Sequence, residues 1–125
     1  MASSYHYRNH QSKEANVTEL FLRADIGATG APTLDTAASK GIASIARNDT
    51  GDYTITLSEA YNSLLMVDVM VLEADDTDIT HQVISQDVSN STPTVKVGFH
   101  AAATPVDPPN GSDVYMRITV KNSSV

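Results

Sequence analysis

The chain has 125 residues, a net charge of -7 at neutral pH, and neither cysteine nor tryptophan. This length predicts one domain with a core that needs no covalent cross-link, and the absence of cysteine excludes disulfides and thiol catalysis. Fifteen acidic against eight scattered basic residues argue against nucleic-acid binding. No apolar run reaches the ~20 residues of a membrane-spanning helix, and the polar start lacks the apolar core of an export signal.

Residues 1–16 are polar, and we interpret them as an N-terminal arm that precedes a β-domain spanning 17–125. Such an arm is either a flexible terminus or a segment that orders only against a neighbouring subunit. In the second case its tyrosines would be the anchors, because tyrosine buries a large area at a small cost in entropy. The candidate contact residues of the arm are Tyr5, Tyr7 and Arg8.

Seven segments alternate between apolar and polar residues or form short apolar runs, and turn signals separate them. They predict strands over 17–24, 41–47, 53–58, 64–72, 79–88, 94–101 and 113–121. The mixed phase of 79–88 suggests a bulge. Residues 33–40 are ambiguous: Asp35 would cap a short helix through the alanines, and a loop or a partly paired strand fits equally well. This spacing is typical of an all-β antiparallel sandwich or barrel of about seven to eight short strands.

Residues 51–72 are expected to form the core hairpin of the domain. The first half alternates cleanly, so that one face is buried and the other is wet. The second half, 64–72, is apolar on both faces apart from Asp68, which predicts a central strand covered on both sides. Between them, Tyr61 is expected to pack over the sheet as a corner residue.

Few polar groups in the sequence have the spacing that metal binding or catalysis needs. The acidic loop at 73–78 has oxygens that suit Ca²⁺, but it lacks the Asp-x-Asp-x-Asp-Gly pattern, and a solvated turn fits better. His6 and His10 have no helix signal and no third ligand. His81 shares a strand face with apolar residues and is expected to be partly buried, whereas His100 lies on a polar face. We therefore predict no catalytic residue, no cofactor, no metal site and no small-molecule substrate.

The proline-rich loop 105–111 is stiff, because its prolines fix an extended stretch before a tight turn. It is either a plain connection between strands or a preorganised contact for a partner subunit, since stiff loops lose little entropy on binding. The candidate contact residues of this loop are Pro105, Asp107, Pro108, Pro109 and Asn110.

Three stretches resemble segments of small virion proteins from tailed bacteriophages. They are Gly51-x-Tyr53-x-Ile55-Thr56-Leu57 with Tyr61 and Leu64-Leu65; Asp107-Pro108-Pro109-Asn110-Gly111 with Val114, Ile118, Val120 and Lys121-Asn122-Ser123-Ser124-Val125; and Ser4-Tyr5-x-Tyr7-Arg8-Asn9. The resemblance implies a capsid decoration (cement) protein, a head fibre or a related structural protein without catalytic residues.

The resemblance further implies a location on the capsid surface, synthesis in the cytoplasm of the host bacterium, and two partners. These partners are the major capsid protein and further copies of the chain, as a homotrimer onto whose neighbours the arm would cross. No membrane partner is expected. Two other roles remain open: a tail or fibre protein that recognises a host glycan, which would need exposed aromatic residues at a shallow site, and a small hydrolase.

Overall fold

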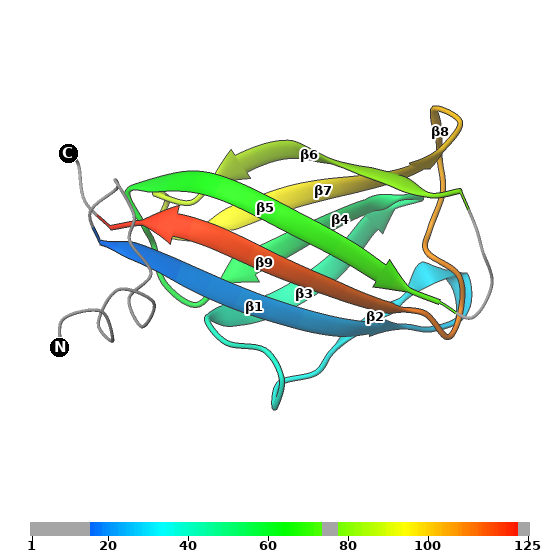
Figure 1. The fold of residues 1–125 in the computed structure, drawn as a ribbon, viewed down its shortest axis with the longest axis horizontal. Coiled ribbons are helices and arrows are strands. Elements are labelled where there is room, and N and C mark those ends of the chain that lie inside the picture. The colour runs from blue at the N-terminus through cyan, green and yellow to red at the C-terminus, as the bar shows by residue number, and fades with distance from the viewer. Residues whose placement is uncertain (1–15, 74–77, 123–125) are drawn as a thin grey trace, which may run out of the picture.

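Nine strands in two antiparallel sheets make up the part of the chain that the computed structural model describes, residues 16–73 and 78–122 (Figure 1). The first sheet has the order β2 (Pro32–Leu34), β1 (Val17–Ile26), β9 (Asp113–Lys121), β5 (Ser63–Leu72). The second has the order β3 (Ile42–Asp49), β4 (Asp52–Leu57), β7 (Thr94–Ala101), β6 (Thr80–Asp87), and the short β8 (Thr104–Pro105) pairs with β7. The predicted all-β sandwich is confirmed.

The core lies between the sheets and is built from alternate residues of four strands, because successive side chains of a strand point to opposite faces. Tyr53 of β4 meets Phe99 of β7 edge to face, with ring centroids 5.6 Å apart. The other buried members on these strands are Leu20, Leu22, Ala24, Ile26, Ile55, Leu57, Val95, Val97, Val114, Met116, Ile118 and Val120. Tyr61 is buried beside them, as predicted.

Most predicted strands appear where the alternation placed them, and the bulge in β6 is confirmed as a register shift between Val83 and Ser85. The ambiguous span 33–40 holds the end of the short β2 and then a turn, not a helix. In this turn the carboxylate of Asp35 accepts hydrogen bonds from the backbone N–H groups of Ala37 and Ala38. Asp35 therefore caps a turn in the way expected of a helix start, but no helix follows.

The predicted core hairpin over 51–72 is wrong, because β4 and β5 belong to different sheets. The predicted central strand over 64–72 is wrong as well, since β5 is the edge strand of the first sheet. Its valines pack against the core, but four of its apolar side chains are 38 to 57% exposed: Leu65, Met66, Met70 and Leu72. The predicted partial burial of His81 is also wrong, because β6 is the edge strand of the second sheet and all its residues are exposed.

The two ends of the sandwich differ. At one pole, Val17 of β1 pairs with Lys121 of β9, and the N–H of Asn122 donates to the carbonyl oxygen of Asn16 over 3.1 Å. The proline-rich loop and the turn between β7 and β8 lie at the opposite pole (Figure 1). Ala102 and Ala103 in that turn both have positive φ, 49° and 70°, a region that costs non-glycine residues free energy.

Candidate functional site

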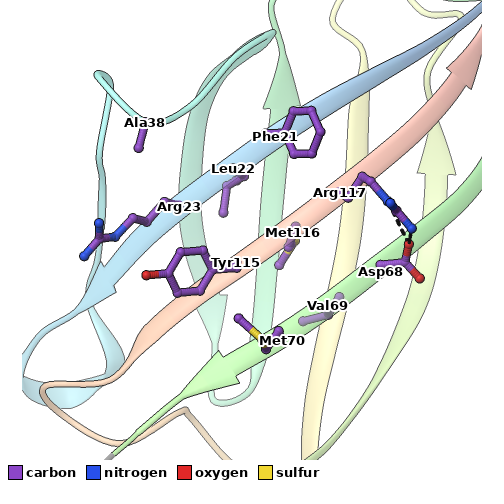
Figure 2. A pocket seen from close by; sticks show the side chains of 10 residues that line it. All are labelled: Phe21, Leu22, Arg23, Ala38, Asp68, Val69, Met70, Tyr115, Met116 and Arg117. Atoms are coloured by element: carbon purple, nitrogen blue, oxygen red, sulfur yellow. Dashed lines mark hydrogen bonds and ion pairs between the residues drawn. The ribbon is translucent and has the colours of Figure 1, made fainter. Parts of the chain in front are cut away.

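An open hollow of about 550 Å³ lies on the outer face of the first sheet, across β1, β9 and β5 (Figure 2). Its charged and large side chains form two rows across these strands, because residues in register lie side by side. In one row Arg117 of β9 lies between Phe21 of β1 and Asp68 of β5, and in the next Tyr115 lies between Arg23 and Met70. The remaining lining residues are Leu22, Ala38, Val69 and Met116. We call this feature the outer-face hollow.

Ion pairs hold the charged side chains of the first row in place. The guanidinium of Arg117 donates from Nη2 to Asp68 Oδ2 over 2.6 Å and from Nε to the same oxygen over 3.0 Å, as Figure 2 shows. Glu19 Oε2 lies 3.5 Å from Arg117 Nε on the other side. The hydrogen bond to Asp68 is the largest cause of a raised pKa of Arg117. Because these groups are half exposed, the pairs add little to stability, but they fix the positions of the charges within the hollow.

A cation–π contact organises the second row. The Cζ atom of Arg23 lies 5.4 Å from the ring centroid of Tyr115, within the range of such contacts. The guanidinium also approaches Asp113, with Nη2 3.5 Å from Oδ2, and Asp35, with Nη1 4.0 Å from Oδ2. Arg23 Nε is shielded from solvent and has no hydrogen-bond partner within the described residues. The row therefore combines an aromatic ring with a guanidinium that is held by two carboxylates.

Two large apolar side chains of the hollow are exposed. Phe21 is 46% exposed and Met70 is 55% exposed, and they flank the middle strand β9 from β1 and from the edge strand β5. Methionine adapts its shape to irregular partners, and exposed clusters of large apolar side chains usually mark a binding site. A mostly apolar lining that also contains an ion pair is an arrangement that binds a partner surface or a flat ring.

The contact residues predicted from the sequence fall into three groups. Tyr5, Tyr7 and Arg8 lie outside the described residues, as does the acidic stretch 74–77. Pro105 and Asn110 are exposed, and Pro109 is half-buried. Asp107 and Pro108 turn into the protein instead: Pro108 is fully buried, and the side chain of Asp107 is only 18% exposed. Partner contacts of this loop stay a prediction.

Asp107 joins the proline-rich loop to the hairpin of β3 and β4. Its carboxylate accepts hydrogen bonds from Arg47 Nη2 (2.9 Å), from the backbone N–H of Gly51 (2.8 Å) and from the hydroxyl of Tyr53 (3.2 Å). Burial alone would raise the pKa of Asp107, but the hydrogen bonds from Arg47 and Gly51 outweigh it and lower the pKa. Gly51 has φ 71°, and a Cβ there would lie 2.5 Å from the carbonyl oxygen of Phe99, so only glycine fits this position.

The structure also locates the histidines and carboxylates that the sequence analysis considered as metal-binding or catalytic groups. Within residues 16–73 and 78–122, no group of three His, Asp or Glu side chains could hold a metal ion, and no helix could span a membrane. His81 and His100 lie on neighbouring strands beside a smaller hollow of about 320 Å³, together with Thr80, Gln82 and Ala103. His81 is exposed and His100 is half-buried.

Comparisons with protein-family models, with curated proteins and with solved structures find no match for this chain. The outer-face hollow was missed by the sequence reasoning, which treated residues 64–72 as buried. The signal was present in the sequence, since Met66, Met70 and Leu72 share a strand face with Asp68. A carboxylate on that face indicates exposure to solvent.

Proposed function

We propose that this chain is a structural virion protein that binds the outside of a tailed-phage capsid and reinforces the shell as a homotrimer. The sequence resemblance supports this role, and so does one structural observation, the exposed outer-face hollow. The role is one of binding, and we assign no catalysis to the chain. The partner in this proposal is the major capsid protein.

The hollow suits the binding of a protein surface for two physical reasons. Apart from Ala38, its residues lie on the three neighbouring strands β1, β9 and β5, so the backbone that carries them is already ordered and loses little entropy on binding. Its exposed apolar side chains beside ion-paired charges also resemble the mixture of apolar and polar residues that a protein interface contains. Phe21 and Met70 would be the anchors, and Arg117 with Asp68 would orient the partner.

The experiment is a binding assay with purified capsids that lack this protein. We expect the double substitution Phe21→Ala and Met70→Ala to weaken binding by about 10- to 100-fold, because anchors at the centre of an interface contribute most of its affinity. Lys96→Ala, on the outer face of the second sheet, is the control and should bind as the unaltered chain does. Equal binding by both variants, or absence of the protein from purified virions, would contradict the proposal.

Glycan recognition by a tail or fibre protein is the second candidate, because the hollow holds two aromatic residues, the exposed Phe21 and the half-buried Tyr115. Tyr115 and Phe21 could stack on sugar rings, with Arg23 and Asp68 as hydrogen-bonding partners. A glycan array with the isolated protein separates the two proposals. Specific binding that Tyr115→Ala abolishes would favour glycan recognition, whereas a blank array together with capsid binding would exclude it.

A further inference from the structure

The two edge strands β5 and β6 lie along the same long side of the sandwich (Figure 1). Among the described residues, every exposed large apolar side chain except Phe21 lies on one of these two strands. They are Leu65, Met66, Met70, Leu72, Val83 and Ile84. We call this side the β5/β6 edge. Strand β5 has ten residues, of which only Asp68 is charged, and β6 has eight residues, of which only Asp87 is charged. Few charges and many exposed apolar groups characterise the core of an interface.

The opposite side of the sandwich is protected. There β2 has only three residues and begins with Pro32, and the exposed residues of β3 are polar or small, among them Ala43, Arg47 and Asn48. Short edge strands, proline and charge are the usual devices that prevent an edge strand from pairing with another chain. The β5/β6 edge has no proline, lysine or arginine, and its protective features are one bulge in each strand and the two aspartates. This asymmetry indicates that the β5/β6 edge is covered in the working assembly.

The inner face of β6 is also uncovered. Val83 is in register with Val97, which is completely buried, so both side chains point to the same face of the sheet. Even so, Val83 is 40% exposed, as every other residue of β6 is exposed too. Because β6 buries so little of its side-chain area, it contributes little to the stability of a single copy. A neighbour that covered β6 would bury apolar area on both faces of this strand.

We propose that this neighbour is another copy of the chain, with β5 of one copy pairing with β6 of the next. The two strands run in opposite directions (Figure 1). A rotation axis parallel to the strands therefore brings β5 of one copy antiparallel to β6 of its neighbour, which is the direction that a tight ladder of hydrogen bonds needs. A closed ring of this kind leaves no β5 or β6 edge unpaired, because each copy uses both strands.

Charge favours this pairing over a two-fold dimer of identical strands. A two-fold pair of β5 strands that keeps both outer faces on one side of the joined sheet would be centred on Val67 or on Asp68. The two Asp68 carboxylates would then lie diagonally or directly opposite each other, and like charges across a strand pair are destabilising. In the ring, Asp68 faces the neutral middle of β6. Both edges face the ring axis, so the ring holds few copies. This inference says how the copies of the proposed homotrimer contact one another. It rests on the proposed function only for the number of copies, three.

The first test is the mass of the isolated protein by light scattering. We expect about 40 kDa, three times the 13.3 kDa of one chain. The double substitution Leu65→Lys and Val83→Lys places lysines on the β5/β6 edge and should give a folded monomer. Ala43→Lys with Ala46→Lys adds the same charge to the protected β3 edge and should leave the mass near 40 kDa. A monomeric unaltered chain, or an unchanged mass for both variants, overturns the proposal.

Cross-linking provides a second measurement that does not depend on a destabilising variant. Since the chain has no cysteine, Leu65→Cys can be co-expressed with Gln82→Cys, Val83→Cys or Ile84→Cys, and the product oxidised. Disulfides form only between residues whose Cα atoms lie within about 7 Å. We expect a covalent dimer from one such mixture and none from any single variant. A dimer from Leu65→Cys alone would indicate a β5–β5 pair and overturn the ring.

Failure of the ring and failure of the proposed function are separate results. A chain that stays monomeric but binds capsids would remove the ring and leave the capsid role intact. A trimer that does not bind capsids would remove the capsid role and leave the ring intact.

Discussion

At the scale of single residues, Asp107 is the side chain whose loss we expect to cost most. Substitution to alanine would leave Arg47 and the N–H of Gly51 without their shared acceptor, whereas the hydroxyl of Tyr53 would keep the carbonyl oxygen of Gly30 as its acceptor at 2.6 Å. An unpaired buried donor such as the N–H of Gly51 typically costs about 1–3 kcal/mol, whereas the exposed guanidinium of Arg47 loses less because water can replace its partner. We expect Asp107→Ala to lower the free energy of unfolding by about 1–3 kcal/mol in urea titrations.

Asp78→Ala is the control for this measurement, because Asp78 is exposed and surface substitutions usually change stability by less than about 0.5 kcal/mol. A loss of equal size in both variants would show that the hydrogen bonds of Asp107 do not stabilise the fold.

The same residue predicts how stability depends on pH. Its pKa is lowered from the ordinary value of 3.8, so the charged form is favoured in the folded state. The stabilisation is therefore complete above about pH 5 and is lost as the pH falls through 3.8 towards the lowered pKa. We expect Asp107→Asn to have a lower melting temperature near pH 6 and a smaller further loss between pH 5 and pH 3. Parallel profiles for the two proteins would contradict this assignment.

At the scale of elements, the turn between β7 and β8 is strained in a way that substitution can relieve. Two-residue turns with positive φ at both positions favour Asn-Gly, and here Ala102 and Ala103 occupy them. We expect Ala102→Asn with Ala103→Gly to stabilise the protein by about 1–2 kcal/mol, seen as a higher melting temperature. Ala43→Gly, within strand β3, should instead destabilise it by about 0.5–1 kcal/mol. A lower melting temperature for the turn variant would show that the turn is not strained.

The strands with one buried face were predictable from the sequence, and the edge strands were not. In β9, Val114, Met116, Ile118 and Val120 alternate with polar residues, so the pattern predicts which face of the strand is buried. In β5 both faces are apolar, and hydrophobicity alone does not reveal whether the outer face is covered by the same chain, by another chain or by water. The interpretation of 64–72 as a central strand chose the first possibility, and the structure shows the outer face uncovered.

The candidate site was less predictable than the fold, because it depends on register between distant strands. Phe21, Asp68 and Arg117 become neighbours only through the pairing of β1 and β5 with β9, and no local pattern contains that pairing. Asp107 is a similar case: it was selected for its position in a stiff loop, but its partners Arg47 and Tyr53 lie more than fifty residues earlier in the chain. Those partners make it part of the internal structure of the domain.

At the scale of the whole molecule, strand β5 belongs to both proposed interfaces. Its outward side chains Asp68 and Met70 line the outer-face hollow, while its free backbone edge would pair with β6 of a neighbour. In the proposed ring the three hollows are therefore held at fixed positions relative to one another. Linked sites of modest affinity bind far more tightly than single ones when their spacing matches the target, so the monomeric lysine variant should also bind capsids much more weakly.

The meeting of β1 and β9 at one pole has a practical consequence for engineering. Because Val17 and Lys121 are paired, the entry and exit of the domain are separated by roughly one strand spacing, about 5 Å. The domain can therefore be spliced into an exposed loop of a carrier protein with short linkers. A fluorescent protein or an antigen joined directly before Val17 or directly after Lys121 would emerge from the same pole, so the proline-rich loop at the far pole would stay free of the cargo.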